Sequence, residues 1–501
     1  MESLRRRTSY FSSESERYEA EPEKNSRFSV FDRIGRLLKA ETRGVQRVEE
    51  DERTDTSSWA AGSMWLAANL VVGTFSLGAL GVTVFQLGFY QCTLTIVFFN
   101  LLGCIPFAFF SVFGSRFGLR QMMLTAFLAG NYGMRIFACL QCIACVGWGA
   151  TNIMSSAQLL HIVNGGALPP WAGCLIIVVI TFFVTFFGYT AIHYYEMYSW
   201  IPNFIIFLII IARMTMSKNF TPGIWESGPT AAGNVLSFGG TVFGFAAGWT
   251  TYSADYTTYM SLNTNPYKIF FSTLTGLWLP SVFAMTLGAA CATGTLSNDQ
   301  WAQMYEDYSI GGLIYSVLVT DSLHGFGQFC CVLLALSTVC NNIPNMYSVA
   351  LCVQAIWSKF RIIPRIFWTL LANFLTLGIC IPAFYEFESY IHNFMNCVAY
   401  FQSIYISITL SEHFIYRRGF KGYNPDDYLD SSKLPIGIAG ICGFIFGVFG
   451  VALGMNQTWY SGEVARLIGD YGGDIGFELA IAFSFVGFNI ARPFEIKYFG
   501  R

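Results

Sequence analysis

The chain has 501 residues, of which 54% are hydrophobic, 17% aromatic and only 12% charged, with a formal net charge of -2. A water-facing surface does not carry this composition, so it excludes a soluble globular protein and predicts a polytopic, all-α membrane protein. The charges gather at the start: residues 1–57 hold 12 of the 29 Lys and Arg and 13 of the 31 Asp and Glu.

Residues 1–57 mix both signs of charge with serine and contain few apolar residues, so they cannot bury enough surface to fold alone. We expect a disordered cytosolic arm that could meet a ubiquitin ligase or trafficking adaptors. The arm has no apolar core before a small-residue cleavage site, so it is not a secretory signal. The first hydrophobic span must therefore direct insertion.

Twelve stretches of about 20 apolar residues follow, each long enough to cross a hydrocarbon layer of roughly 30 Å. Their centres are Thr74, Phe98, Trp148, Val179, Ile206, Phe245, Phe283, Ser337, Asn373, Phe401, Phe444 and Ala482. We expect a ten-helix transport core in residues 58–425. Residues 426–501 add two spans and a short cytosolic C-terminus, and residues 292–325 form an external loop with a short helix.

The connections between spans differ in charge on the two sides of the membrane. One side carries Arg116, Arg120, Lys359, Arg361, Arg365, Arg417, Arg418 and Lys421. The other side carries the acidic residues Asp299, Glu306 and Asp307, with Arg213, Lys218 and Arg466 as its bases. Because bases are retained on the cytosolic side, both termini are predicted to be cytosolic.

Glycine clusters interrupt spans one and six. Span one has Gly73, Gly78 and Gly81 around Ser76, and span six has four glycines up to Gly248, just before Trp249. Such clusters indicate either close helix packing or a helix break that exposes backbone groups to a ligand. Spans one and six correspond if the first ten spans form two five-span halves, and this pairing favours a binding site near the bilayer midplane.

Spans three and eight also correspond, and both carry polar residues on one helix face. Trp148 and Asn152 are spaced i, i+4, as are Asn341 and Asn345. An asparagine in hydrocarbon is costly unless its amide is hydrogen-bonded, so these side chains should face protein, water or a ligand. The alternative is that the asparagines only join helices to one another. Pro344, between them, is predicted to kink span eight.

An amide offers an acceptor and two donors in one plane, which complements the edge of a purine or pyrimidine. Indole rings provide faces on which such a heterocycle stacks. Trp148 and Trp249 are therefore predicted to hold a flat, uncharged ligand, while Asn152, Asn341 and Asn345 read its edge. Cys139, Cys142 and Cys145 share no acid or histidine on their helix face, so we interpret them as core residues and expect no metal site.

These residues resemble the fungal purine-cytosine permeases of the nucleobase cation symporter-1 family. The resemblance rests on NNIPN at residues 341–345, the Trp148–Asn152 pair and GWTTYSADY at residues 248–256, and it extends from about Trp59 to the last residue. It implies a LeuT-like five-plus-five inverted repeat with two further helices, in the plasma membrane. It also implies Ser76 and Glu196 as substrate-site residues, and uptake of adenine, guanine, hypoxanthine and cytosine with protons.

The coupling ion is predicted to be a proton. Sodium-driven relatives that carry hydantoins have a hydroxyl pair before the first asparagine of span eight, where this chain has Val339 and Cys340. Ser337 and Thr338 lie two positions earlier, about 200° around the helix, so we expect no sodium site. A carboxyl that gains and loses a proton could couple transport, and Glu196 is the first candidate and Asp255 the second. The alternative for both is an interfacial carboxylate.

We therefore expect a nucleobase/proton symporter that works by alternating access, without a cofactor. Ser76 and the exposed backbone near Gly78 and Gly248 would line the unwound halves, with Asn342 and Pro344 in supporting or gating positions. The rivals are a carrier of another flat amide, such as uracil, allantoin or hydantoin, and a non-transporting nucleobase sensor. No cluster of acids, histidines or metal ligands indicates an enzyme, and no nucleic-acid partner is expected.

Overall fold

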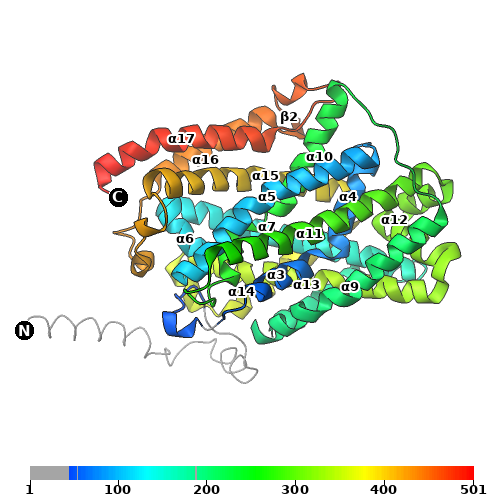
Figure 1. The fold of residues 1–501 in the computed structure, drawn as a ribbon, viewed down its shortest axis with the longest axis horizontal. Coiled ribbons are helices and arrows are strands. Elements are labelled where there is room, and N and C mark those ends of the chain that lie inside the picture. Colours follow the sequence, from blue (N-terminus) through cyan, green and yellow to red (C-terminus); the bar gives the residue numbers. More distant parts are fainter. Residues whose placement is uncertain (1–43, 54, 187–188) are drawn as a thin grey trace, which may run out of the picture.

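The computed structural model describes residues 44–53, 55–186 and 189–501, and most of its long helices run along the longest axis of the molecule (Figure 1). Helices lie at all twelve predicted span centres. They are α3 (Ser58–Asn69) with α4 (Val72–Thr83), α5 (Phe89–Phe117), α7 (Gly130–Val163), α8 (Pro170–Phe186), α9 (Tyr189–Ser217), α10 (Pro229–Ala247) with η2 (Thr250–Tyr256), α11 (Pro266–Ala292), α13 (His324–Ile356), α14 (Arg365–Ala383), α15 (Phe387–Ser411), α16 (Ile438–Gly454) and α17 (Gly476–Phe499).

Shorter elements connect the spans. They are η1 (Glu50–Glu52), α6 (Gln121–Leu128), η3 (Thr293–Leu296), α12 (Asp299–Leu318), η4 (Val319–Leu323), η5 (Ser358–Ile362), η6 (Phe384–Glu386), η7 (Glu412–Tyr416), η8 (Phe420–Gly422), η9 (Pro425–Leu429), β1 (Asn456–Gln457), β2 (Tyr460–Ser461) and η10 (Ala465–Leu467). The two strands form one small antiparallel hairpin before α17. Seven helical stretches of the described residues are long and apolar enough to cross a bilayer, and a bent pair adds an eighth.

The expected external loop at residues 292–325 is more structured than predicted. Its helix α12 is 20 residues long and turns sharply at Ser309, whose φ of 49° is left-handed. Beyond this turn Ile310, Leu313 and Ile314 are buried in the core. The second half of α12 is therefore part of the folded body, because its apolar side chains pack against α7 rather than facing water.

Span one is broken, but not at its glycines. Helices α3 and α4 meet at a bend of 54°, and the break lies at Leu70 and Val71. Val71 is extended, with φ -135° and ψ 164°, and it begins a β-branched pair that favours this conformation. Gly78 lies inside the continuous helix α4, where a Cβ would overlap the Met285 carbonyl oxygen of α11. The expected unwinding at Gly78 is wrong: this glycine serves close packing.

Span six is broken where its glycines predicted. Helix α10 ends at Ala247, Gly248 caps it, and the chain continues as the 3₁₀ segment η2. Inside η2, Tyr252 has φ -143° and ψ 16°, which is not helical. The two broken helices are thus the first spans of the two five-span halves, and an inverted repeat places them in corresponding positions.

The N-terminal part of the described chain and the C-terminus lie at the same end of the molecule, the left of Figure 1. We call this the terminal end. Arg47 Nε donates to the Phe117 carbonyl at 3.0 Å, and Arg501 Nη1 donates to the Ser431 carbonyl at 3.0 Å. Val45 and Val48 are buried, so the part of the predicted arm at residues 44–53 packs on the body. Residues 1–43 lie outside the described chain.

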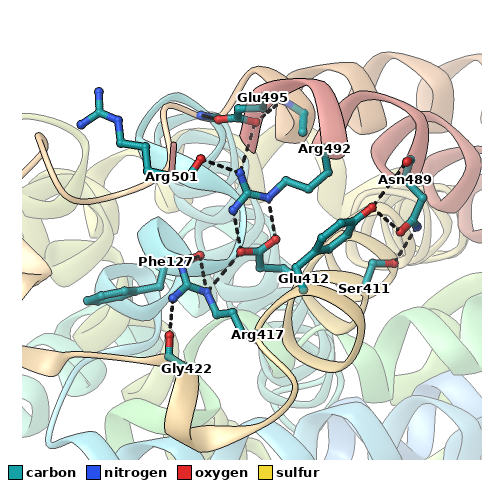
Figure 2. Close-up of polar contacts among 12 residues, drawn as sticks. Phe127, Ser411, Glu412, Arg417, Gly422, Asn489, Arg492, Glu495 and Arg501 are labelled. Atoms are coloured by element: carbon teal, nitrogen blue, oxygen red, sulfur yellow. Dashed lines mark hydrogen bonds and ion pairs between the residues drawn. The ribbon is translucent and has the colours of Figure 1, made fainter. Parts of the chain in front are cut away.

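An ion cluster, defined as Glu412, Arg417, Arg492 and Glu495, joins η7, which follows α15, to α17 at the terminal end (Figure 2). Arg492 donates from Nε and Nη2 to the two carboxylate oxygens of Glu412, both at 2.8 Å. Glu495 accepts from the backbone N–H groups of Gly437 and Ala439, each at 2.8 Å, at the start of α16. The two additional helices are therefore fixed to the ten-helix core by charge as well as by apolar packing.

Candidate functional site

The predicted site residues come together between the two broken helices and the long helices α7 and α13. Asn152 of α7 donates from Nδ2 to Asn341 Oδ1 at 2.7 Å and to Asn342 Oδ1 at 2.9 Å, both on α13. Asn341 in turn donates to the Ala68 carbonyl, near the break in span one, at 2.5 Å. These side chains are at most 1% exposed. The amides of the two symmetry-matched helices thus face each other.

Asn345 connects α13 to the broken span six. Its Nδ2 donates to the Asn341 carbonyl at 2.9 Å, and its Oδ1 accepts from the Tyr252 hydroxyl at 2.9 Å. The Tyr256 hydroxyl donates to the Pro344 carbonyl at 3.1 Å. Helix α13 runs through Pro344 without a break, so the proline lies inside one helix. Two tyrosines of η2 therefore rest on the NNIPN segment.

Trp148 and Trp249 lie against each other rather than facing each other across a gap. Their ring centroids are 5.6 Å apart and their planes are inclined by 31°. A flat ring between two indoles needs about 7 Å between them, because each gap is about 3.5 Å. In this conformation the predicted sandwich is closed. Trp65 of α3 packs edge-on against Trp249 at 5.1 Å, so the break in span one also reaches this pair.

Several polar atoms around the breaks have no hydrogen-bond partner although they are buried. These described atoms are Thr74 Oγ1, Trp148 Nε1, Trp249 Nε1, Thr250 Oγ1, Asn342 Nδ2 and Gln402 Oε1. A buried polar group without a partner costs roughly 1–3 kcal/mol. Because buried polar groups normally have partners, these six atoms are candidate contacts for a ligand.

The other predicted residues have local roles in this conformation. Ser76 Oγ donates to the Val72 carbonyl at 2.8 Å within α4. Ser337 Oγ accepts from the Val72 N–H at 3.1 Å and so caps α4 at the break. Gly73 was not singled out as a site residue, yet a Cβ there would lie 2.8 Å from Asn152 Oδ1.

Of the two candidate proton carriers, Asp255 lies buried at the end of the broken span six. Asp255 is 4% exposed, and its Oδ1 accepts from the Gln121 N–H at 2.7 Å. Its backbone carbonyl accepts from Arg120 Nη1, also at 2.7 Å. Asp255 thus joins the end of span six to the start of α6. The side chain of Glu196, in α9, lies outside the described residues.

Comparison with known proteins decides the family. The family model of permeases for cytosine/purines, uracil, thiamine and allantoin matches residues 47–473. The chain belongs to this permease family. It is 56% identical to purine-cytosine permease FCY21 of Saccharomyces cerevisiae, over 95% of this chain and 90% of that protein. It is 46% identical to purine-cytosine permease fcyB of Emericella nidulans, over 95% and 93% of the two chains. The permease is therefore a membrane transporter and not an enzyme.

A solved structure confirms the fold of the permease. The nucleobase-cation-symport-1 family transporter Mhp1, in a closed conformation with bromovinylhydantoin bound, superposes with a TM-score of 0.68. The match covers 91% of this chain and 95% of that chain at 14% identity, which shows the fold alone. The predicted LeuT-like architecture, with two further helices, is confirmed.

Sequence reasoning missed a second polar group beside the indoles of this permease. Gln141 of α7, Thr251 of η2 and Gln402 of α15 are fully buried and hydrogen-bonded to one another. The signal was present, because both glutamines interrupt apolar runs as the asparagines do. The same argument about the cost of amides in hydrocarbon would have found them.

Proposed function

We propose that this permease imports purine bases and cytosine together with protons by alternating access. The observation that carries the proposal is the meeting of Asn152, Asn341 and Asn345 beside two indoles whose N–H groups lack partners. The matching family and the relatives named for purines and cytosine support the substrate class. The proposed substrates are adenine, guanine, hypoxanthine and cytosine.

The described conformation is then a closed state without room for the base. Opening would separate Trp148 from Trp249 and let the base stack between them, which is worth roughly 1–3 kcal/mol per base. The asparagines would exchange their mutual hydrogen bonds for bonds to the edge of the base. Ser76 and Gly248 would lie along the opened breaks, with Asn342 and Pro344 beside them. Asn342 would bring an Nδ2 that has no partner in the closed state.

Proton coupling requires a group that changes its charge during the cycle. Glu196 and Asp255 remain the candidates, and the burial of Asp255 supports a role for it. The hydroxyls of Ser337 and Thr338 form hydrogen bonds with Val72 and Ser156, and the proposed cycle uses no sodium ion. No cofactor or metal enters the proposed cycle.

The proposed setting is the plasma membrane with both termini in the cytosol. The bases Arg47, Arg53 and Arg417 at the terminal end support this orientation. Residues 1–57 would offer the cytosolic contact for a ubiquitin ligase or trafficking adaptors. Lipid and the small-molecule base are the other proposed partners.

The test is uptake of labelled adenine and cytosine by cells that lack their own carriers, with and without a proton uncoupler. We expect uptake that the uncoupler abolishes and that unlabelled purine bases compete for. Asn152→Ala, Asn341→Ala and Asn345→Ala should each lose most of this uptake at equal surface amount. Undiminished uptake in all three would refute the site.

The same experiment separates the alternatives. Competition by uracil, allantoin or hydantoin but not by adenine would identify a carrier of another flat amide. Binding of adenine without net flux would identify a sensor.

A further inference from the structure

Gln402 lies in the middle of α15 and contacts the broken part of span six. Its Nε2 donates to the Gly248 carbonyl at 3.1 Å and to Thr251 Oγ1 at 2.8 Å. The Thr251 hydroxyl donates to Gln141 Oε1, and Gln402 Nε2 lies 3.5 Å from the same oxygen. Helices α7, η2 and α15 are therefore joined by one group of buried polar side chains.

The orientation of the Gln402 amide is set by its partners. Rotating the amide by half a turn would place Oε1 against the Gly248 carbonyl oxygen, and two acceptors would face each other. The Thr251 hydroxyl already gives its only hydrogen to Gln141, so it can only accept from Gln402. Donation from Gln402 to Gly248 is thus the arrangement in which the Gly248 carbonyl and the Thr251 hydroxyl both have a partner.

The Gly248 carbonyl oxygen is part of the peptide group that joins Gly248 to Trp249. Gly248 lies at the end of α10 and Tyr252 departs from helical geometry, so the regular α-helical hydrogen bonds of span six end at this peptide. A Cβ on Gly248 would lie 3.2 Å from Trp148 Nε1, which shows how closely this peptide approaches the second indole. A side chain that holds the Gly248–Trp249 peptide plane therefore constrains the direction in which the Trp249 side chain leaves the backbone.

We propose that Gln402 is a positioning residue for the substrate site: it holds the Gly248 carbonyl and thereby sets the angle of the Trp249 indole. The inference rests on the proposed function for its consequence in transport, but the contact itself does not depend on the substrate. Through Gln141 and Thr251 the same group ties Trp249 to α7, which carries Trp148 and Asn152.

A purely structural amide would be satisfied on all sides, and this one is not. Gln402 Oε1 and the neighbouring Ser403 Oγ are buried without a partner. Gln402 thus retains an acceptor for a donor that arrives when η2 moves away from α7. The residue is expected to matter for which bases bind, because a tilted indole stacks less well on a flat ring.

The test compares Gln402→Met, which keeps the length of the side chain without its amide, with Gln402→Glu, which keeps the shape but cannot donate in its ionised form. Cys397→Ala is the control, because Cys397 is an exposed residue on the same helix. Surface amount is measured for each variant with a fluorescent fusion. We expect Gln402→Met to raise the KM for base uptake about tenfold with a smaller change in maximal rate, and to alter the ratio of inhibition by adenine and cytosine.

Thr251 provides a second pair of variants. Thr251→Val removes the hydroxyl and should behave like Gln402→Met, whereas Thr251→Ser retains it and should restore the KM. Equal KM and equal selectivity in wild type, Gln402→Met and Thr251→Val would overturn the proposal.

A measurement without substrate keeps this inference separate from the proposed function. Hydrogen exchange of the purified, ligand-free permease should become faster in residues 248–256 of Gln402→Met and stay unchanged in Cys397→Ala. If wild type imports no base, the proposed function fails, while faster exchange would still support the positioning role. Unchanged exchange in Gln402→Met would overturn the positioning role whatever the substrate.

Discussion

The amide cluster at the broken helices and the ion cluster at the terminal end are both buried and polar, yet they are built differently. The carboxylate oxygens of Glu412 and Glu495 all have partners, supplied by Arg492, Arg417 and two backbone N–H groups (Figure 2). Around the asparagines and indoles, by contrast, several donors and acceptors are unsatisfied. The carboxylates of the ion cluster thus have all their hydrogen-bond partners, whereas the neutral groups at the breaks do not.

This difference separates an anchor from a site that changes partners. A buried charge without a counterion costs several kcal/mol, so the ion cluster is expected to stay closed. A neutral amide or indole N–H costs less when it is left alone, so a helix pair can close over it and open again. We therefore expect the contacts at the terminal end to persist and the contacts at the breaks to change partners during transport.

The largest effect is expected from removing the central guanidinium of the anchor. Arg492→Met leaves Glu412 with Arg417 as its remaining cation in the cluster, and this should destabilise the permease by about 3–5 kcal/mol. The unfolding temperature of the purified protein and the amount of protein at the cell surface should both fall. Lys497→Met, an exposed position on the same helix, is the control. Equal stability of the two variants would show that the cluster does not anchor α17.

A charge placed in the amide cluster should abolish transport more than it affects folding. Asn341→Asp removes the donor to the Ala68 carbonyl and sets a carboxylate against that oxygen. We expect uptake to fall by about 100-fold or more, because a buried charge without a partner is costly. The exposed loop variant Asn263→Asp should transport normally. Full uptake by Asn341→Asp would show that transport does not depend on the Asn341 amide.

A smaller change at the indoles should weaken binding without preventing it. Trp148→Phe keeps an aromatic face but reduces its area, so the KM for base uptake should rise by about tenfold or less. Trp171→Phe, at an exposed indole, should leave the KM unchanged. The two variants are compared by uptake kinetics at matched surface amount. An unchanged KM in Trp148→Phe would remove this ring from the proposed site.

The smallest effect is expected at an exposed ion pair, which contrasts with the buried cluster. Arg466 and Glu463 lie 3.4 Å apart, with side chains 56% and 78% exposed. Such pairs contribute about 0–1 kcal/mol, so Arg466→Ala should change neither the unfolding temperature nor uptake measurably. A marked loss of stability or uptake in Arg466→Ala would mean that an exposed ion pair can matter as much as the buried ion cluster.

Much of the fold followed from hydropathy because a bilayer imposes length and apolarity on each span. The twelve centres and the break before Trp249 were therefore accessible from the sequence. The break in span one was misplaced, because glycines that allow close packing and glycines that end a helix look alike in a sequence. Gly78 is of the first kind, and the extended residue is Val71.

The candidate site was predictable in its residues but not in its state. Asn152, Asn341 and Asn345 stood out because amides are rare in apolar spans. The contact between Trp148 and Trp249 was not foreseeable, since a sequence does not say whether two helices stand open or closed. Gln402 was missed because α15 carries no second amide three or four residues from it, the spacing that marked Asn341 and Asn345.

Helix α11 has one more consequence, because it packs by glycine against both halves of span one. On one side Gly276 of α11 meets the Gly62 backbone of α3, and on the other Gly288 meets the Phe75 backbone of α4. Backbones in such close contact cannot slide past each other without a clash. If span one bends further at Leu70 and Val71, α11 must separate from α3 or from α4, and we expect it to separate from the half that it holds less tightly.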